Sequence, residues 1–549
     1  MFKERKSAIR WIFNNAKPIL GSILFLTLIG VFVSYISVEF AMATRLLLDS
    51  ATGASEDSFS SCIIRLAVLL VVELAAESIY NLYEVRLSAR YRNKLQCKLF
   101  TTIMTRDFTG VNEYHSGELI NRLTGDIDII NSNIIGIVPA LVTLVTGVVF
   151  SFVAMMKLDL SLSLICLALG PVVLLSSALY GRRMKKLHAA CRASDGKTRS
   201  FMQECIQNIM ALKAFGSERK AAHHASLLQY ENYKLNMKRG YISLFVNILY
   251  YVALTVAYYF AVAWCAYKIS AGLMTVGVFT AIVQLVNSIQ QPFRQISGTV
   301  SQFFATCASA ERIMEIEFID EDEPEGNNIA DFTAIDVSKL KFAYDDEVIF
   351  DDASFTVNKG DIAVISGSSG KGKTTLFKLL LGILKPHAGE LCIYNKEEKI
   401  SIGSSTRSLF AYVPQGNMII SGTIRKNIAF FDDTPDPERV EEAARLACIL
   451  DYINTLPEGM DTVLGENGLG LSEGQVQRLA IARALYLDAP VILLDEATSA
   501  LDDETEAQIL QNIKLLKNKT CIIISHRAAA FDIATRKIHL SDHALQTTM

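Results

Sequence analysis

Long apolar runs fill the first 300 residues of the chain, and polar positions divide them into segments of membrane-spanning length. A helix needs about 20 mostly apolar residues to cross about 30 Å of hydrocarbon. Beyond residue 330, short β-rich runs alternate with helical segments, a pattern that predicts an α/β domain with a largely parallel sheet. In the first part we predict six membrane spans, with boundaries near 18–46, 60–82, 134–156, 160–180, 241–267 and 274–293.

Lysine and arginine are concentrated in alternate loops between these spans. Residues 1–17 hold five of them, residues 85–130 hold seven and residues 181–240 hold thirteen, whereas residues 49–60 hold none. The positive-inside rule therefore predicts that both termini lie in the cytoplasm. The two long basic loops predict helices that continue well into the cytoplasm, and the mixed basic and apolar residues 1–17 predict a helix in the membrane interface.

An acidic segment separates the two parts of the chain. Seven Asp and Glu residues lie between Glu315 and Glu325, together with a proline, and this mixture is typical of a solvated linker. We predict four regions: an interfacial helix at 1–17, a transmembrane domain at 18–314, a linker at 315–330 and an α/β domain at 331–549.

Composition supports a membrane protein. Hydrophobic residues make up 51% of the chain and charged residues 20%, and the mean hydropathy is +0.29, which is too apolar for an ordinary soluble enzyme. The expected partner is a lipid bilayer. The net charge of −4 does not favour nucleic acid as a partner. The ten cysteines form no CxxC pair, so we expect them to be reduced packing residues.

A glycine-rich loop follows the apolar strand Ile362–Ile365 and opens a helical run. Glycines let backbone N–H groups converge on phosphate oxygens, and the helix N-terminus adds positive potential. Lys373 is expected to reach the β- and γ-phosphates of a nucleotide, and the Thr374 hydroxyl is expected to bind Mg²⁺. The residues that we assign to nucleotide binding here are Gly367, Ser368, Ser369, Gly370, Lys371, Gly372, Lys373, Thr374 and Thr375.

Two carboxylates follow a second apolar strand, Val491–Leu494. Ligands of open α/β sheets bind at the C-terminal ends of the strands, where Asp495 and Glu496 lie. Asp495 suits Mg²⁺ coordination, and Glu496 is the candidate general base that polarises the attacking water. An acidic pair alone would more often be a helix cap, but with the glycine-rich loop it indicates a nucleotide hydrolase.

The order of these motifs resembles the ABC transporter family, in its exporter-type (type IV) half-transporter arrangement. Leu471–Gln475 matches the family signature and precedes the strand that ends at Asp495. The resemblance implies a multi-domain fold, in which an all-α six-helix transmembrane domain precedes an α/β P-loop NTPase domain of ABC type. It also implies that ATP and Mg²⁺ are bound.

Further residues match family positions, and their roles are implied by the resemblance. Tyr344 would stack on adenine, His526 would hold the γ-phosphate, and Gln415 would sense that phosphate and contact the transmembrane domain. Ser499–Asp502 matches the loop that links two ATP sites. The expected catalytic residues are thus Glu496, His526 and Gln415, the expected magnesium ligands are Thr374, Gln415 and Asp495, and the signature residues expected to contact ATP are Ser472, Gly474 and Gln475.

The family geometry requires two facing ATP-binding domains, because each signature closes on the ATP of the other. The expected partner is therefore a second copy or a homologous half-transporter. Short helices near 109–114 and 208–216 would dock on these domains. One position departs from the family pattern, which usually has glycine where this chain has Glu473. Its carboxylate would repel a γ-phosphate if it faced one, or would favour the helix dipole if it pointed away.

An acidic stripe in the second predicted span bears on the cargo. Glu73 and Glu77 are four residues apart on one helix face. A charge at mid-membrane costs about 2.5–3.5 kcal/mol on insertion scales, so each should face a cavity or a partner. A cavity would favour a cationic or polar cargo. The alternatives are pairing with a neighbouring helix and a position near the outer interface.

The resemblance implies an ATP-driven transmembrane transporter, an exporter that couples ATP hydrolysis to alternating access. A peptide, a lipid and an amphipathic small molecule all remain open as the transported substrate. An importer of metal–chelate complexes and an ATP-gated channel remain the alternatives on the same scaffold. The expected location is the bacterial cell (inner) membrane, as a multi-pass protein.

Overall fold

The structure, a computed structural model, describes residues 2–322, 332–344, 347–368, 370–395, 398–416, 418–465, 470–516, 519–541 and 544–548. The side chains of residues 2–6, 166–183, 185, 250, 254, 291–301 and 546–548 also lie outside this description. The chain divides into two compact units. The first consists of Met1–Thr101 and Ser116–Ile316, and the second of Thr102–His115 and Glu317–Met549.

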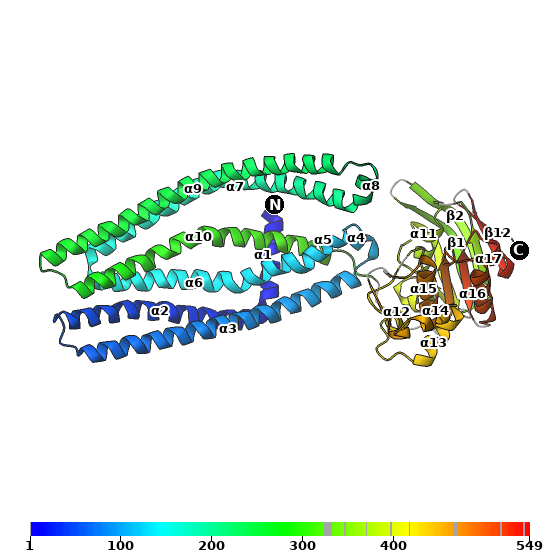
Figure 1. Ribbon diagram of the computed structural model, residues 1–549, viewed down its shortest axis with the longest axis horizontal. Helices are drawn as coiled ribbons and strands as arrows, with labels where there is room; N and C mark the ends of the chain where they lie inside the picture. The colour runs from blue at the N-terminus through cyan, green and yellow to red at the C-terminus, as the bar shows by residue number, and fades with distance from the viewer. Residues whose placement is uncertain are drawn as a thin grey trace. The chain divides into compact units, whose positions relative to one another are not determined.

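The first unit is built from long helices, of which α2 packs along α6 and α7 along α9 (Figure 1). Each of the six predicted spans lies in its own long helix. The short helices α5 and α8 belong to the loops between them, and a π-helical turn at Arg122–Asp126 leads into α6. The helices are α1 (Phe2–Ala16), α2 (Leu20–Ala51), α3 (Phe59–Thr105), α5 (Ser116–Asn121), α6 (Ile127–Leu158), α7 (Leu160–Gln207), α8 (Ile209–Ala214), α9 (Glu218–Ser270) and α10 (Val276–Glu317).

Four helical stretches among the described residues are long and apolar enough to cross a membrane. Val276–Gln290 adds a shorter apolar stretch at the start of α10. Many apolar side chains on these helices are exposed, such as Val71 and Leu74 of α3, which suits contact with lipid. The four stretches are Ser7–Ala51, Phe59–Thr105, Ser116–Leu158 and Glu218–Ser270.

Small residues let α2 and α6 approach each other closely. A Cβ atom on Gly30 would lie 2.3 Å from Oγ1 of Thr143, so a larger residue at this crossing would require the Thr143 side chain to move. The Ser34 hydroxyl lies within 3.3 Å of the Thr143 carbonyl oxygen and 3.1 Å of the Gly30 carbonyl oxygen. Packing of this kind stabilises helices in lipid, where burial of apolar side chains gives no advantage.

The second unit contains a six-stranded sheet in the order β12-β11-β3-β10-β9-β6. Five of its strands are parallel, and only β12 pairs antiparallel with its neighbour. A four-stranded antiparallel sheet, in the order β2-β1-β4-β5, packs nearby and shares a hydrophobic core with one face of the first sheet. The fold class predicted for this part of the chain is confirmed. The strands of the two sheets are β1 (Ala334–Tyr344), β2 (Glu347–Asn358), β3 (Ile362–Ser366), β4 (Ala388–Asn395), β5 (Glu398–Ser401), β6 (Phe410–Val413), β9 (Val491–Asp495), β10 (Thr520–Ile524), β11 (Arg536–Ser541) and β12 (Ala544–Thr548).

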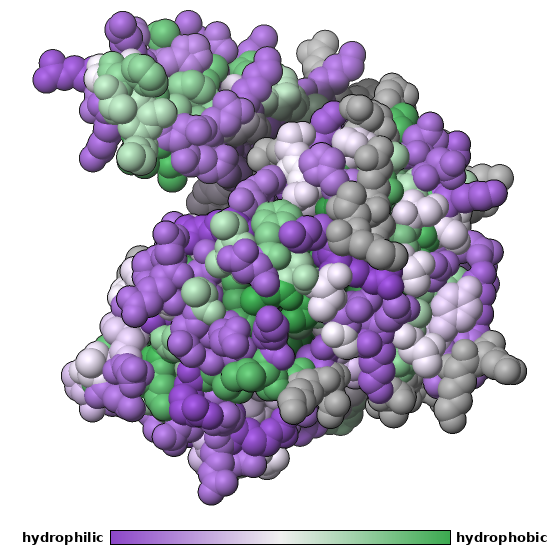
Figure 2. Space-filling model, turned by 90° about the vertical axis from the view of Figure 1, so that its right-hand side faces the viewer, coloured by the Kyte–Doolittle hydropathy of each residue, from purple (hydrophilic) through white to green (hydrophobic). Residues whose placement is uncertain are grey.

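Helices cover both faces of the six-stranded sheet, and a two-stranded ribbon, β7 (Gly422–Thr423) with β8 (Val463–Leu464), lies among them. Hydrophilic side chains cover most of the face of this unit that Figure 2 turns to the viewer. Such a surface is typical of a unit that lies in water. The helices are α11 (Lys373–Leu380), α12 (Ile424–Ala429), α13 (Pro437–Leu446), α14 (Leu450–Thr455), α15 (Glu473–Leu487), α16 (Asp503–Leu515) and α17 (Ala528–Ile533).

A short helix from the first part of the sequence, α4 (Phe108–Asn112), also belongs to the second unit. The Asp107 side chain caps its first turn by accepting a hydrogen bond from the Thr109 N–H at 3.0 Å. Backbone hydrogen bonds and an ion pair join this segment to residues 320–322: the Asp107 N–H donates to the Asp320 carbonyl, and Arg106 lies 3.1 Å from Glu321.

Candidate nucleotide site

Four adjacent parallel strands deliver the predicted site residues to one edge of the six-stranded sheet. β3 leads into Gly367, β10 leads into His526, β9 ends at Asp495, and β6 leads towards Gln415. The register keeps these ends level, since Ile524 of β10 pairs with Asp495 of β9. The C-terminal edge of a parallel sheet is where such folds bind their ligands.

The glycine-rich loop takes a backbone path that other residues would not adopt. Gly370 and Gly372 have φ angles of 81° and 94°, in the left-handed region that glycine favours. A Cβ atom on Gly372 would lie 2.2 Å from Cγ2 of Ile349, and one on Gly367 would lie 2.7 Å from the Leu540 carbonyl oxygen. The loop thus has no room for side chains at these two positions, which leaves its backbone free to face a phosphate.

The remaining loop residues differ in exposure. Ser368 is exposed and Lys371 is half-buried, whereas Thr375 in the first turn of α11 is buried. Ser369 lies outside the described residues.

Lys373, the first residue of α11, points back across the loop. Its Nζ atom donates to the Gly367 carbonyl at 2.6 Å and lies 2.7 Å from Nε2 of His526 and 3.9 Å from Oε1 of Glu496. Because an ammonium group can only donate, Nε2 of His526 is the acceptor in this contact. Burial lowers the pKa of Lys373, although Glu496 and Asp495 act in the opposite direction. A poorly solvated cation of this kind suits an anionic ligand.

Asp495 is fully buried at the end of β9. Burial raises the pKa of its carboxyl group, against the effect of hydrogen bonds from Thr374 and Tyr412. The Tyr412 hydroxyl donates to Asp495 at 3.3 Å, and burial raises the pKa of that hydroxyl well above its usual value. A cation beside Asp495 would offset the cost of burying its charge. The adjacent hydroxyl and carboxylate oxygens therefore fit Mg²⁺, which prefers such ligands.

Glu496 lies between the other charged groups. Its Oε2 atom accepts a hydrogen bond from Nε2 of Gln415 at 2.7 Å, and its Oε1 atom lies 3.9 Å from the ring of His526. The backbone places the side chain there through a φ angle of 48°, which is unusual for a residue other than glycine. The Glu496 N–H donates to the Ile524 carbonyl, so β10 holds this turn. The structure thus brings the three predicted catalytic residues together.

The signature residues form the start of α15. The Ser472 hydroxyl accepts from the Gln475 N–H at 3.3 Å, and the Gln475 side chain accepts from the Ser472 N–H at 2.8 Å, a reciprocal cap. A Cβ on Gly474 would lie 3.0 Å from the Ala500 carbonyl oxygen, so this glycine allows close packing on the loop after β9. Glu473 is exposed in the first turn of α15, where its charge favours the helix dipole. Among the described contacts, none joins these signature residues to the cluster formed by Lys373, Glu496 and His526.

Tyr344 lies on the hairpin that borders the glycine-rich loop. It pairs with Glu347 across β1 and β2, and Ile349, further along β2, lies against Gly372. Tyr344 is 42% exposed, and its ring meets that of Phe342 edge-on. An exposed aromatic face beside a phosphate loop can stack on a base.

One arginine that we did not single out in the sequence organises the loop beyond Glu496. Arg527 donates to the carbonyls of Ser499 and Leu501 at 2.9 and 2.8 Å, and to the carboxylate of Glu506 at 2.9 Å. The Glu506 side chain is 2% exposed and also accepts from Thr498. Its position directly after His526 is the only signal in the sequence that could have identified Arg527.

A second arginine joins the end of α11 to the segment that carries α4. Arg407 donates to the carbonyls of Leu381 and Gly382 at 3.0 and 2.9 Å and forms an ion pair with Asp322. The Asp322 N–H in turn donates to the Thr105 carbonyl. Arg407 and Asp322 thus connect the end of α11 to Thr105, which lies just before α4.

Comparison with known proteins places these features in a family. The chain is 30% identical over 448 residues to an ATP-dependent lipid A-core flippase of Desulfotalea psychrophila, covering 80% of this chain and 78% of the relative. The flippase of Pseudomonas fluorescens is 30% identical over 482 residues, covering 85% and 79%. A solved bacterial Atm1-family ABC exporter with ATP bound has a similar fold, with a TM-score of 0.80 over 97% of this chain and 95% of that chain at 21% identity.

Two family models match separate parts of the sequence. Residues 19–293 match the ABC transporter transmembrane region, and residues 350–499 match the ABC transporter model of the ATP-binding part. The first match covers most of the long helices of the first unit. The second includes the glycine-rich loop, the signature, Asp495 and Glu496. The chain is therefore an integral membrane protein that belongs to the ABC transporter family, with the transmembrane and ATP-binding regions fused in one polypeptide.

Proposed function

We propose that the chain is one half of an ATP-driven exporter that works as a dimer. The observation that carries this proposal is the convergence of Lys373, Asp495, Glu496, Gln415 and His526 at one sheet edge, in a chain whose other unit consists of membrane-spanning helices. A site that cleaves a phosphoanhydride needs a cation for the phosphates, a base for water and donors for the developing charge. Each of these groups is present.

In this proposal, Lys373 binds the β- and γ-phosphates, and the glycine-rich loop supplies backbone donors. Glu496 accepts a proton from the attacking water, held by the hydrogen bond from Gln415. His526 contacts the γ-phosphate, and Tyr344 stacks on adenine. Thr374, Asp495 and Gln415 hold Mg²⁺, which neutralises charge on the phosphates when it is bound.

Two chains are required because the signature of one chain does not reach its own cluster. We propose that Ser472, Gly474 and Gln475 close on the ATP bound by the facing chain, with the α15 N-terminus directed at the γ-phosphate. The facing chain is a second copy or a homologous half-transporter. Mass measurement of the purified complex, with only this chain expressed, distinguishes these two, because a homodimer gives twice the mass of the chain.

ATP binding would then be transmitted to the membrane helices through α4 and α8. Arg407 and Asp322 provide a route within the second unit from the end of α11 to the segment before α4. The apolar residues Ile209, Met210 and Phe215 at α8 are exposed, as a docking surface requires. Hydrolysis then resets the helices. Coupling of this kind requires that cargo or ATP binds one conformation better than the other.

The proposed location is a bacterial inner membrane with both termini in the cytoplasm, as the distribution of lysine and arginine predicts. A protease site added at either end should be cut in inside-out vesicles and protected in right-side-out vesicles. The two relatives described above are lipid A-core flippases, so lipid is one cargo class to test.

The experiment that tests the proposal is the replacement of Glu496 by glutamine. Removing a general base lowers a rate by about 10²–10⁴-fold, so Glu496→Gln in bilayers with Mg²⁺ should bind ATP but hydrolyse it at least about a hundredfold more slowly. Glu504→Gln is the matched control, since this carboxylate is exposed on α16. Normal turnover by Glu496→Gln, or the absence of ATPase activity from the wild-type dimer, would refute the proposal.

A further inference from the structure

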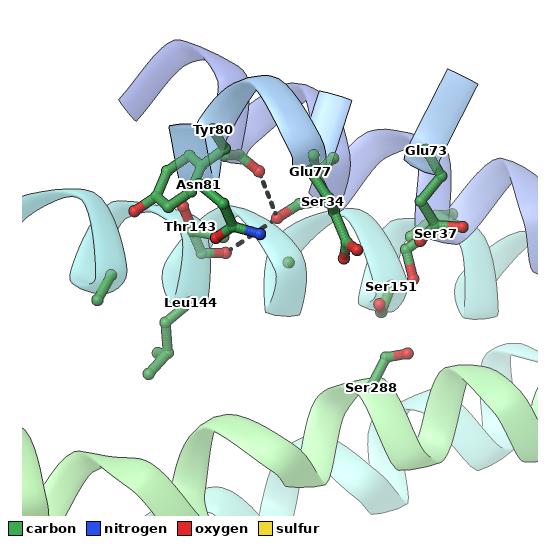
Figure 3. Close-up of a pocket in the computed structure, with 15 residues that line it drawn as sticks. Ser34, Ser37, Glu73, Glu77, Tyr80, Asn81, Thr143, Leu144, Ser151 and Ser288 are labelled. Carbon is green, nitrogen blue, oxygen red and sulfur yellow. Dashed lines mark hydrogen bonds between the residues drawn. The ribbon is translucent and has the colours of Figure 1, made fainter. Parts of the chain in front are cut away.

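A cavity of about 550 Å³ lies within the first unit, between α2, α3 and α6, with Ser288 of α10 opposite them (Figure 3). Ligand pockets in proteins usually measure about 300–1,000 Å³. The lining is mixed: apolar side chains such as Val33 and Leu144 alternate with hydroxyl groups and the ring of Tyr80. The cavity therefore has the size and the composition of a site for an amphipathic molecule.

Two carboxylates enter this cavity from α3. Figure 3 shows the side chains of Glu73 and Glu77 extending from α3 into the space beside α6. Among the described residues, neither carboxylate forms an ion pair or a hydrogen bond. The one arginine on the same stretch of α3, Arg65, is already paired with Glu39 of α2 at 3.0 Å. The cavity thus holds two carboxyl groups that no described basic side chain pairs with.

A buried hydroxyl provides a second and independent sign of a ligand. Ser151 of α6 is 1% exposed, lines the cavity, and its Oγ atom has no hydrogen-bond partner among the described residues. Other hydroxyls in these helices bond to the carbonyl four residues earlier: Thr27 lies 2.7 Å from the Ile23 carbonyl, and Thr146 bonds in the same way. A buried polar group without a partner is costly, so a partner from the cavity is expected.

We propose that this cavity binds the cargo of the transporter and that the cargo is an amphipathic organic cation. The carboxylates of Glu73 and Glu77 recognise the positive charge, the Ser151 hydroxyl accepts or donates one hydrogen bond, and the Tyr80 ring with the aliphatic lining covers the apolar part. A bare metal ion fits less well, because no group of three metal-ligating side chains occurs among the described residues. The inference rests on the proposed function, since it names the class of cargo.

The test compares two ions of nearly the same size and shape and opposite charge, tetraphenylphosphonium and tetraphenylborate. Binding of each labelled ion to the full-length protein is measured in nanodiscs of neutral phosphatidylcholine, after subtraction of binding to empty nanodiscs. We expect the Kd for the cation to be at least about tenfold lower than the Kd for the anion, which corresponds to about 1.4 kcal/mol. Equal affinities, or a preference for the anion, would overturn the proposal.

Substitutions locate the charge that is recognised. In the double variant Glu73→Gln and Glu77→Gln, the preference for the cation should fall at least about tenfold, because both charges are lost and both shapes are kept. Glu84→Gln is the matched control, since this carboxylate lies on the same helix outside the cavity lining. A double variant that retains the wild-type preference would contradict the assignment. Binding of a fluorescent ATP analogue confirms that each variant is folded.

A labelling experiment keeps the proposal testable if the double variant does not fold. In Ser288→Cys with both carboxylates intact, tetraphenylphosphonium should slow maleimide labelling of the peptide that carries residue 288, and tetraphenylborate should not. Equal labelling in the presence of the two ions would count against the cavity as their site. The ion-binding and labelling measurements are made without nucleotide. A failure of ATPase activity would therefore refute the proposed function alone, and a failure of ion discrimination would refute only the cargo class.

Discussion

Replacement of Arg527 by alanine should destabilise the second unit and slow its ATPase at the same time. The guanidinium group donates to the Ser499 and Leu501 carbonyls and to Glu506. Breaking a buried ion pair costs about 3–5 kcal/mol. The Arg527 side chain is 32% exposed, whereas Glu506 is 2% exposed, so we expect a value near the lower end, about 3 kcal/mol.

Calorimetry of the full-length protein in nanodiscs is the assay that measures this change. Both tryptophans, Trp11 and Trp264, lie in the first unit, so intrinsic tryptophan fluorescence would not report on the second unit. The transition of the second unit is the one that ATP moves to higher temperature. For a unit of this size, about 3 kcal/mol corresponds to a decrease in Tm of about 6–12 °C.

Two further variants make the result interpretable. The first is a control at an exposed ion pair, and the second separates the charge of Arg527 from its contacts with the loop. Arg445→Ala removes an exposed pair with Glu442 in the same unit and should leave the Tm almost unchanged, because solvent screens such a pair. Arg527→Lys keeps a positive charge near Glu506 but cannot reach both carbonyls, so it should recover most of the Tm and little of the ATPase rate. If Arg527→Ala lowers the Tm no more than Arg445→Ala does, the reasoning is wrong.

Three other substitutions test separate parts of the structure. Gly372→Ala places a methyl group 2.2 Å from Ile349 at a φ of 94°, so it should abolish measurable binding of a fluorescent ATP analogue. Binding at wild-type affinity would contradict the loop geometry. Tyr412→Phe removes the hydroxyl that donates to Asp495 and should lower the affinity for Mg²⁺ about tenfold in ATPase titrations, and an unchanged titration would refute its positioning role. Ser151→Ala should leave the Tm of the ligand-free first unit unchanged or raise it by a few degrees, because the lost hydroxyl has no described partner. A decrease in Tm above about 5 °C would show that the Ser151 hydroxyl forms a hydrogen bond within the protein.

The local motifs in the sequence predicted the parts of the fold that depend on backbone geometry. The glycine pattern at 367–372 predicted a turn between a strand and a helix, which the structure has between β3 and α11. The apolar pattern predicts a helical run over 375–384, but α11 ends at Leu380, because the chain turns at Gly382 with a φ of 60°. A Cβ there would lie 2.6 Å from Gly403, a contact that the local pattern does not encode.

Contacts between residues distant in sequence could not be predicted in the same way. Arg407 and Asp322 are 85 positions apart, and each is an ordinary charged residue in its own segment. The pairing of Arg527 with Glu506 depends on how β10 and α16 are placed by the sheet. The cavity beside Glu73 was one of three alternatives, because hydropathy gives the depth of a charge but not the direction in which it faces.

The left-handed conformation of Glu496 also bears on how durable this protein can be. A residue other than glycine in that region costs about 1–3 kcal/mol, and here its carboxylate adjoins the buried Asp495. Glycine at this position would relax the strain, so Glu496→Gly should survive heating better than the native chain while losing hydrolysis. The native sequence gives up heat resistance at this one peptide unit in order to hold an acidic group where water must be activated.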